Sequence, residues 1–223
     1  MENEQKYTHM IWDWNGTLFN DVEWCLSILN TMLSKRGIRT VHDVHEYRNV
    51  FQFPIIEYYR NVGFDFNAEP FEVLAVEFIE LYHSNNSGNC KLFQHTENVL
   101  ASIRERGLTQ VILSASKTSL LLSQITEFDI QSFFDEICGI TDIYAKSKID
   151  AGLEYIARNN INQALLIGDT VHDFEVANAL DVDCLLIAAG HQSREKLLAC
   201  GVPVLDNITQ VTEHLSITGP KQQ

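Results

Sequence analysis

The sequence is poor in basic residues and has no long apolar run. Its 16 lysines and arginines stand against 30 aspartates and glutamates, which gives a net charge of −14 over 223 residues. This acidic excess argues against DNA, RNA or an anionic membrane as a partner, because such polyanions bind basic surfaces. No apolar run approaches the roughly 18 residues that a membrane-spanning helix requires. We therefore expect a protein that binds neither nucleic acid nor membrane.

Paired cysteines and a secretion signal are also missing. The five cysteines are odd in number and none has C-x-x-C spacing: Cys25, Cys90, Cys138, Cys184 and Cys200. Reduced, mostly buried thiols in a reducing compartment are the natural interpretation. The start, Met-Glu-Asn-Glu-Gln-Lys, has neither the basic nor the apolar region of a signal peptide. We expect a cytoplasmic protein, monomeric or weakly dimeric.

Strand-like and helical patterns alternate along most of the chain. The predicted strands are Tyr7–Asp13, Thr109–Ser114, Glu136–Gly139, Ala164–Asp169, Asp183–Ile187 and Val202–Leu205. The predicted helices are Glu97–Gly107, Lys117–Glu127, Lys148–Asn159, Asp173–Leu180, Arg194–Cys200 and Ile208–Leu215. Alternation at this spacing predicts an α/β fold with a doubly wound, mainly parallel sheet.

Between residues 19 and 85 this alternation stops. Apolar residues recur at helical spacing in two stretches: Val22, Leu26, Leu29 and Leu33, then Phe71, Leu74, Phe78 and Leu81. An aromatic piece, Tyr47–Gly63, lies between them. We predict a helical insertion over residues 19–85, with residues 1–18 and 86–223 forming the α/β core. Short turn-rich segments at both ends would let the insertion swing over one edge of the sheet.

Asp13 follows the first predicted strand and opens the segment Asp13-Trp14-Asn15-Gly16-Thr17. Carboxyl ends of parallel strands share the sheet edge where α/β proteins bind ligands. A carboxylate there can attack phosphorus or ligate a metal, and the amides of the Gly16 turn could face an anion. The alternative is an ordinary Asn-Gly turn of a β-hairpin.

Two further aspartates repeat this pattern. Asp169 ends the strand Ala164–Asp169, and Asp173 follows four residues later. Together with Asp13 they would repel one another strongly unless a cation lay between them, and oxygen ligands suit Mg²⁺. The alternative is that Asp169 and Asp173 cap the following helix.

A serine and a lysine complete a candidate phosphate site. Ser114 ends the strand Thr109–Ser114, with Ala115 next, and Lys148 opens a predicted helix. Lysine supplies a positive charge for phosphate oxygens. Singly, Ser114 is typical of a turn and Lys148 of a solvated helix start. Lys146 has the same local setting, but Lys148 fits the distance to Asp169 better.

The order Asp-x-Asn-Gly-Thr, Ser114, Lys148, Gly168-Asp169 and Asp173 resembles the four motifs of the haloacid dehalogenase superfamily, over Met10 to about Gly190. Within this superfamily, the sequence most resembles the phosphoglycolate-phosphatase-like hydrolases. The resemblance implies a helical cap and Mg²⁺-dependent hydrolysis of small phosphomonoesters through an aspartyl-phosphate on Asp13. Its implied metal ligands are Asp13, the Asn15 carbonyl, Asp169 and Asp173. Its implied phosphate-binding residues are Gly16, Thr17, Ser114, Ala115 and Lys148.

Asn15 departs from this family's pattern. Phosphatases of the family usually carry an aspartate there as general acid and base, whereas an amide cannot exchange a proton at neutral pH. Four interpretations stay open: a substrate with a good leaving group, replacement by His172 or His191, a slow protein that chiefly binds phosphorylated ligands or regulates, or spontaneous deamidation of Asn15 before Gly16. In the helical insertion, Arg48 and Arg60 are candidates to bind a substrate carboxylate, or are simply solvated.

Overall fold

A parallel β-sheet forms the centre of the computed structural model, which describes residues 6–84, 90–140 and 147–218. Within these residues the sheet has six strands in the order β5-β4-β1-β6-β7-β8, and every adjacent pair is parallel. The strands are β1 (His9–Trp12), β4 (Thr109–Lys117), β5 (Glu136–Ile140), β6 (Ala164–Gly168), β7 (Asp183–Ile187) and β8 (Val204–Leu205). The predicted α/β fold class is confirmed.

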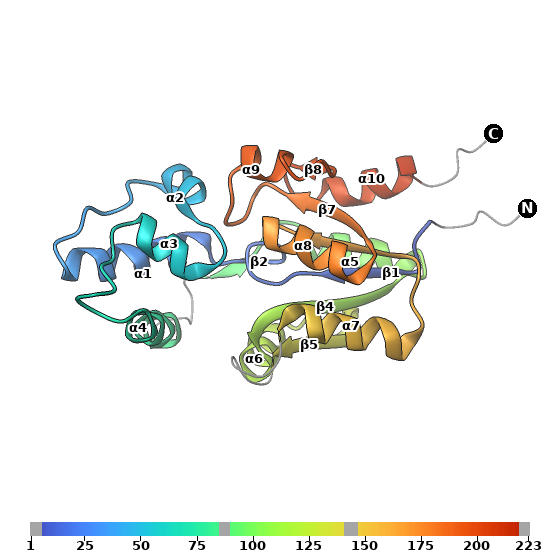
Figure 1. The fold of residues 1–223 in the computed structure, drawn as a ribbon. Coiled ribbons are helices and arrows are strands. Elements are labelled where there is room, and N and C mark those ends of the chain that lie inside the picture. Colours follow the sequence, from blue (N-terminus) through green and yellow to red (C-terminus); the bar gives the residue numbers. More distant parts are fainter. Residues whose placement is uncertain (1–5, 85–89, 141–146, 219–223) are drawn as a thin grey trace, which may run out of the picture.

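Helices cover both faces of this sheet (Figure 1). Successive residues of a strand point to opposite faces, so Met10 and Trp12 belong to one core and Ile11 to the other. The first core packs against α5 (Thr96–Glu105), α6 (Thr118–Glu127) and α10 (Gln210–Thr218). The second packs against α7 (Lys148–Asn159), α8 (Val171–Leu180) and α9 (Arg194–Leu198). Because both faces are buried, the strands read as continuous apolar runs.

Most predicted elements are found within a few residues of their expected ends. Helix α7 and strand β7 have the predicted bounds. Strand β4 continues to Lys117, three residues beyond the predicted end, through an irregular pairing with β5. Helix α8 begins two residues early because Thr170 caps it in a capping box with Asp173. A short 3-10 helix, η1 (Gln131–Phe133), was not predicted.

Helices α1 (Val22–Lys35), α2 (Val44–Val50), α3 (Ile55–Asn61) and α4 (Phe71–Ser84) form a separate body beside the sheet, which we call the cap (Figure 1). They enclose an apolar cluster of their own, with Leu29, Met32 and Leu74 fully buried. Two short antiparallel strands, β2 (Phe19–Asn20) and β3 (Lys91–Leu92), pair where the chain enters and leaves the cap. The expected domain boundaries at 18/19 and 85/86 remain predictions, and residue 85 lies outside the described residues.

The structure can be compared with two features of the sequence, its unpaired cysteines and its lack of a long apolar run. All five cysteines are free thiols. Across the described ranges, no helix combines the length and the hydrophobicity needed to cross a membrane.

Candidate active site

The candidate site lies at the carboxyl edge of the sheet, beside the central strand. Trp12 pairs with Ile112 of β4 on one side and with Ile167 of β6 on the other. The residues that follow therefore emerge at one level, and they include Asp13 and Asp169. Both carboxylates are buried, with 8% and 1% of their surface exposed. Strand order reverses at β1, and such switch points are where α/β sheets bind ligands.

Two tryptophans fix the backbone on either side of Asp13. Trp12 and Trp14 are fully buried, and each indole N–H has an amide acceptor in the core. Trp12 Nε1 donates to Gln110 Oε1 at 3.2 Å, and Trp14 Nε1 donates to Gln124 Oε1 at 2.9 Å. These bonds hold Asp13 in position without contacting it. They were not predicted, since the two glutamines lie about a hundred residues away.

Lys148 joins two of the three aspartates. Its Nζ donates to Asp13 Oδ1 and to Asp173 Oδ1, both at 2.5 Å. Burial alone would lower the pKa of Lys148, but the two carboxylates raise it above its usual value, so the ammonium stays charged. Burial raises the pKa of Asp13 to about 6, against the opposing effect of Lys148. The solvated alternative for Lys148 is wrong, because the residue is only 4% exposed.

Asp173 has both a structural and an electrostatic role. Its Oδ2 accepts from the backbone N–H of Thr170 at 3.0 Å and from the Thr170 hydroxyl at 2.6 Å, which caps helix α8. Its other oxygen faces Lys148. Burial alone would raise the pKa of Asp173, but the charge of Lys148 lowers it. The capping interpretation is therefore correct for Asp173, and it coexists with the predicted place in the site.

The turn after Asp13 uses its own amides, which corrects one expectation. Gly16 N donates to Phe19 O and Thr17 N donates to Trp14 O, so neither amide is free to face an anion. The turn is no β-hairpin, because β4 and β6 occupy the two sides of β1 and both are parallel to it. What reaches the site is the Thr17 hydroxyl, which lies 3.2 Å from both Asp13 Oδ2 and Asp169 Oδ1.

Glycines make room for the Asp169 carboxylate. Gly16 has φ +76°, and a Cβ there would lie 2.3 Å from Asp169 Oδ2. A Cβ at Gly190 would lie 2.1 Å from the same oxygen. The backbone N–H of His191 donates to this oxygen at 2.6 Å. Side chains at either glycine would displace Asp169, so these loops are built around its carboxylate.

The three aspartates fit a divalent cation. Asp13, Asp169 and Asp173 each offer an oxygen, and these atoms lie within 4.8 Å of one another. Burial raises the pKa of Asp169 to about 8, and the neighbouring Asp13 adds to this shift. Lys148 offsets only part of this negative charge, and a cation between the carboxylates would stabilise their ionised forms. The donor set, all oxygen, suits Mg²⁺.

Asn15 is held by three hydrogen bonds. Its Oδ1 accepts from Ser116 Oγ at 2.7 Å. Its Nδ2 donates to Asp21 Oδ2 at 2.8 Å and lies 3.1 Å from the Tyr82 hydroxyl. These contacts define which end of the amide is oxygen and which is nitrogen. The residue therefore acts as a fixed link between β4 and the cap.

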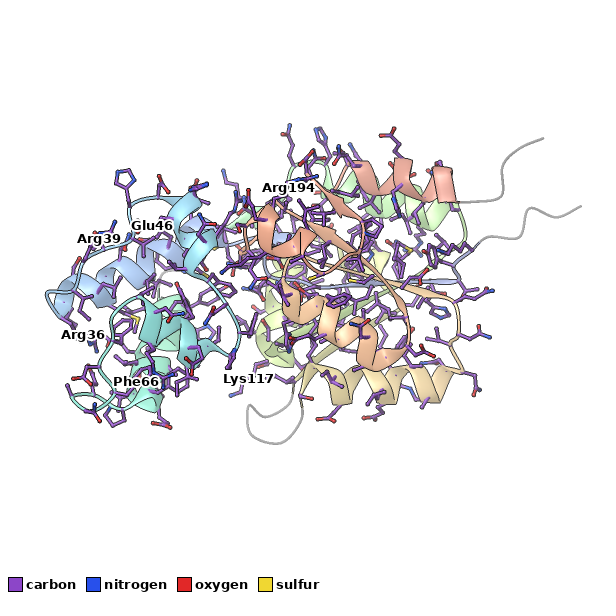
Figure 2. All side chains as sticks on the ribbon, turned by 45° about the horizontal axis from the view of Figure 1, so that its top comes forward. Arg36, Arg39, Glu46, Phe66, Lys117 and Arg194 are labelled. Atoms are coloured by element: carbon purple, nitrogen blue, oxygen red, sulfur yellow. The ribbon has the colours of Figure 1, made fainter. Side chains whose placement is uncertain are left out.

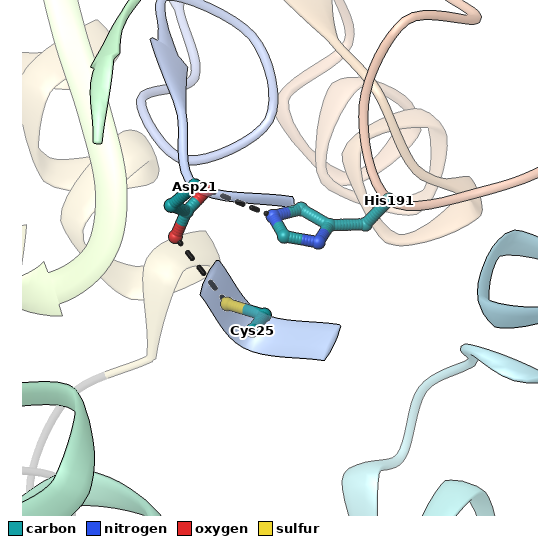
Figure 3. A group of neighbouring side chains, drawn as sticks. All are labelled: Asp21, Cys25 and His191. Carbon is teal, nitrogen blue, oxygen red and sulfur yellow. Dashed lines mark hydrogen bonds and ion pairs between the residues drawn. The ribbon is translucent and has the colours of Figure 1, made fainter. Parts of the chain in front are cut away.

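Asp21 is the centre of a second buried cluster, shown in Figure 3. His191 Nε2 lies 3.1 Å from Asp21 Oδ1, and the thiol of Cys25 donates to Asp21 Oδ2 at 3.6 Å. The Tyr82 hydroxyl donates to the same Oδ2 at 2.8 Å. Burial alone would lower the pKa of His191, but the charge of Asp21 raises it to about 9. Together Asp21 and His191 form an ion pair between cap and core.

The Asp21 cluster is a weaker metal candidate than the three aspartates. Asp21, Cys25 and His191 also have ligand atoms within 4.8 Å of one another. Burial, however, raises the pKa of the Cys25 thiol well above its usual value, and a protonated thiol is a poor ligand. The oxygens of Asp21 already accept several hydrogen bonds. Asp13, Asp169 and Asp173 are therefore the stronger candidate for a metal position.

A cavity of about 650 Å³ opens between the cap and this edge of the sheet. Asp13, Asn15, Ser114, Ala115 and Lys148 line it on the core side, together with Asp169 and Asp173. Ser114 is 1% exposed and its Oγ accepts from Ser116 N. Because β4 continues to Lys117, Ser114 lies inside the strand and not in a turn. The structure thus brings together the predicted site residues that bear side chains. Lys146 lies outside the described residues.

Neither cap arginine lines the cavity, so of the two alternatives the structure does not support substrate binding. Arg48 donates from Nε to Gly190 O at 2.8 Å and from Nη2 to Ala189 O at 2.5 Å. Arg60 pairs with Glu57 on the cap surface. His172 and His191 both line the cavity, and His172 stacks on Phe53 with ring centres 4.7 Å apart.

Comparison with known proteins decides the family. Residues 10–187 match the family model described as haloacid dehalogenase-like hydrolase. The chain belongs to this family of hydrolases. The matched range includes the buried cluster of Asp13, Lys148, Asp169 and Asp173 described above. A search of curated proteins finds no match.

Solved structures of the same fold come from several bacteria. A hydrolase of the haloacid dehalogenase-like family from Streptococcus pneumoniae is 18% identical, with a TM-score of 0.80 over 94% of this chain and 98% of that one. A predicted phosphatase from Clostridium acetobutylicum is 20% identical, with a TM-score of 0.78 over 95% and 99%. A predicted phosphoglycolate phosphatase from Haemophilus somnus is 14% identical, with a TM-score of 0.75 over 95% and 99%. At these identities the likeness concerns the fold.

Proposed function

We propose that this protein is a Mg²⁺-dependent phosphatase that hydrolyses small phosphomonoesters through an aspartyl-phosphate. The observation that carries the proposal is the buried cluster in which Asp13 lies beside Lys148, with Asp169 and Asp173 converging on the same point. The structures from C. acetobutylicum and H. somnus that share the fold are titled as a predicted phosphatase and a predicted phosphoglycolate phosphatase.

Asp13 is the proposed nucleophile. One carboxylate oxygen forms a bond to phosphorus while the bond from phosphorus to the leaving oxygen breaks, and the alcohol leaves as its anion. Water then attacks phosphorus, the bond from phosphorus to the Asp13 oxygen breaks, and inorganic phosphate departs as the carboxylate is restored. The proton that the water loses passes to solvent and balances the alcohol anion released in the first step. Lys148 and the Ser114 hydroxyl bind the oxygens of the phosphoryl group, where charge is spread in the transition state.

Bound Mg²⁺ would neutralise carboxylate charge and polarise the phosphoryl oxygens. Asp13, Asp169 and the backbone carbonyl of Asn15 are its proposed ligands, with Asp173 as a further partner. The Thr17 hydroxyl, which contacts both Asp13 and Asp169, orients the two carboxylates. Aromatic side chains of the cap that line the cavity, among them Phe51, Phe53 and Tyr58, would shield the aspartyl-phosphate from bulk water.

A second function remains open because of Asn15. A protein with this site and no proton donor at position 15 would bind a phosphorylated ligand and turn it over slowly, as a regulatory protein does. The three hydrogen bonds that hold the Asn15 amide favour this alternative, since they leave it no role in proton transfer.

Phosphate release from a panel of esters tests the proposal. We expect release from acetyl phosphate and aryl phosphates that is lost with EDTA and in Asp13→Asn. Mg²⁺ at 100 times its Kd would stabilise the fold by about 2.7 kcal/mol, and so raise Tm by about 5–10 °C. Asp169→Asn would lose this rise, whereas Asp206→Asn, a surface control, would keep it. Binding of Mg²⁺ without turnover of any ester would support the regulatory alternative.

A further inference from the structure

The cap wall of the cavity is apolar. Its side chains are aromatic or aliphatic and come mainly from α3, α4 and the segment before α3; they include Phe51, Phe53, Tyr58, Phe71, Phe78 and Ile79. The hydroxyl of Tyr82, also in this wall, already donates to Asp21. The wall therefore offers a surface for a hydrophobic group and few polar groups for a hydroxylated one.

The cavity also offers little to a second negative charge on the substrate. Among the described residues that line it, no arginine is present, because Arg48 binds backbone carbonyls and Arg60 pairs with Glu57. Lys117 and His83, which do line it, are exposed to solvent. His191, also in the lining, already pairs with Asp21, and His172 stacks on Phe53. A carboxylate buried against the aromatic wall would lose its hydration without gaining a partner, which is strongly unfavourable.

Asn15 points to the same kind of substrate from the chemical side. Without a proton donor at this position, the leaving oxygen departs as an anion. A phenol, with a pKa near 10 like that of tyrosine, leaves far more readily than an alkanol, whose pKa is closer to the 15.7 of water. The fixed amide and the apolar wall are independent observations, and both favour an aromatic leaving group.

From these observations we propose that the substrate is a phosphomonoester with an apolar aromatic leaving group, an aryl phosphate, rather than a phosphorylated sugar or hydroxy acid. This inference rests on the proposed function, since it names the substrate of the same site. The phosphoryl group lies against Asp13 and Lys148, and the ring packs among Phe51, Phe78 and Ile79. A volume of about 650 Å³ is within the range of cavities that enclose small organic ligands.

Binding of two non-hydrolysable phosphonates tests this recognition apart from catalysis. Benzylphosphonate carries a ring, whereas phosphonoacetate carries a carboxylate like that of phosphoglycolate. With Mg²⁺ present, calorimetric titration of the wild type is expected to give at least tenfold tighter binding of benzylphosphonate. Equal affinities, a preference for phosphonoacetate, or no binding of benzylphosphonate would overturn the proposal.

Two arginine variants on α4 locate the ring-binding wall. Ile79 lines the cavity and is 43% exposed. Ile79→Arg therefore places a cation in the cavity wall without removing a buried core side chain. We expect it to weaken benzylphosphonate binding about tenfold and to strengthen phosphonoacetate binding. Val76, 54% exposed on the same helix and not lining the cavity, gives the matched control Val76→Arg, which should change neither. An unchanged ratio in Ile79→Arg overturns the assignment of this wall.

Turnover separates the two proposals. Phosphate release from phenyl phosphate at least ten times faster than from glycolate phosphate, in kcat/KM, supports both. Faster release from glycolate phosphate overturns the aryl assignment and leaves the phosphatase standing. If benzylphosphonate binds more tightly but no ester is hydrolysed, the phosphatase proposal is contradicted. The proposal that the cavity binds an aromatic ring then still stands.

Discussion

At the scale of single residues, Asn15 decides in the proposed mechanism which leaving groups the site tolerates. Its Nδ2 lies 2.8 Å from Asp21 Oδ2. A carboxyl in place of this amide would meet a buried carboxylate at about the same distance. Two carboxylates so close cannot both ionise easily, so the pKa of the new carboxyl would be raised. Such a group keeps its proton near neutral pH and can give it to a leaving oxygen.

Asn15→Asp is therefore expected to raise kcat on alkyl phosphates, by about 10²-fold at the lower end of what general acid catalysis contributes. Aryl phosphates, which need little protonation, should gain much less. Phosphate release from paired alkyl and aryl esters measures the difference. Asn15→Ser removes the amide without adding a carboxyl and should show no gain. An equal gain on both ester classes would contradict the leaving-group argument.

The residues that could be predicted are those whose position is encoded locally. Asp13 and Asp169 end predicted strands and Lys148 opens a predicted helix, so parallel strand order alone brings them to one edge. Asp21 and Tyr82 were not predicted as part of the site. Their contact spans 61 residues and exists only because helices of the cap pack together, which no local pattern encodes.

At the scale of elements, Arg36 ties helix α1 to helix α4 and to the loop before it. Its Nε donates to Glu69 Oε2 at 2.6 Å and its Nη2 to Glu77 Oε2 at 2.5 Å. Arg36 and Glu77 are only 16% and 18% exposed, so solvent screens their pair less than a surface pair. Partial burial alone would raise the pKa of Glu77, but the charges of Arg36 and Lys35 lower it below its usual value.

Glu77→Gln is expected to destabilise the cap at neutral pH by about 1 kcal/mol, the upper end for such pairs. Because the pKa of Glu77 is lowered in the folded state, its contribution to stability is complete above the ordinary value of 4.5. This contribution is lost as the pH falls through the folded-state pKa. The difference from wild type should therefore shrink as the pH falls below 4.5. Thermal unfolding between pH 3 and 7 measures it. Glu80→Gln, an exposed change on the same helix, is the control and should leave the stability at neutral pH unchanged.

Helices and strands with a clear pattern of apolar residues could be predicted, and elements without such a pattern could not. Strands β1, β4 and β6 show as apolar runs because both faces of the sheet are covered. Strands β2 and β3 have two residues each, too few for any alternation to show. Their pairing depends on the cap bringing distant segments together, so sequence patterns alone could not reveal it.

At the scale of the whole molecule, the end of α2 joins the cap to the core. Arg48 binds the carbonyls of Ala189 and Gly190, and the backbone N–H of Ser193 donates to Arg48 O at 3.2 Å. The neighbouring His191 donates its backbone N–H to Asp169, so one loop contacts both the cap and the metal position. The position of the cap and the geometry of Asp169 are thereby linked.

Arg48→Met is expected to loosen the cap while the sheet stays intact. Amide hydrogen exchange should quicken in α2 and α3 and stay unchanged in β1 and β6, because only the contacts between cap and core are lost. Arg39→Met is the control: Arg39 is 75% exposed and pairs within the cap with Glu46 (Figure 2). Faster exchange throughout the sheet would indicate global destabilisation and contradict a local role for Arg48.

The pairing of β2 with β3 has a consequence for how such a protein changes. Phe19 lies opposite Leu92 and Asn20 opposite Lys91, so the chain leaves the core and returns to it at neighbouring points. The segment between them is an insertion that leaves the strand order of the sheet unaffected. Such an insertion can be replaced by another that has a different length and different cavity-lining residues, and the same phosphoryl chemistry would then serve a different compound.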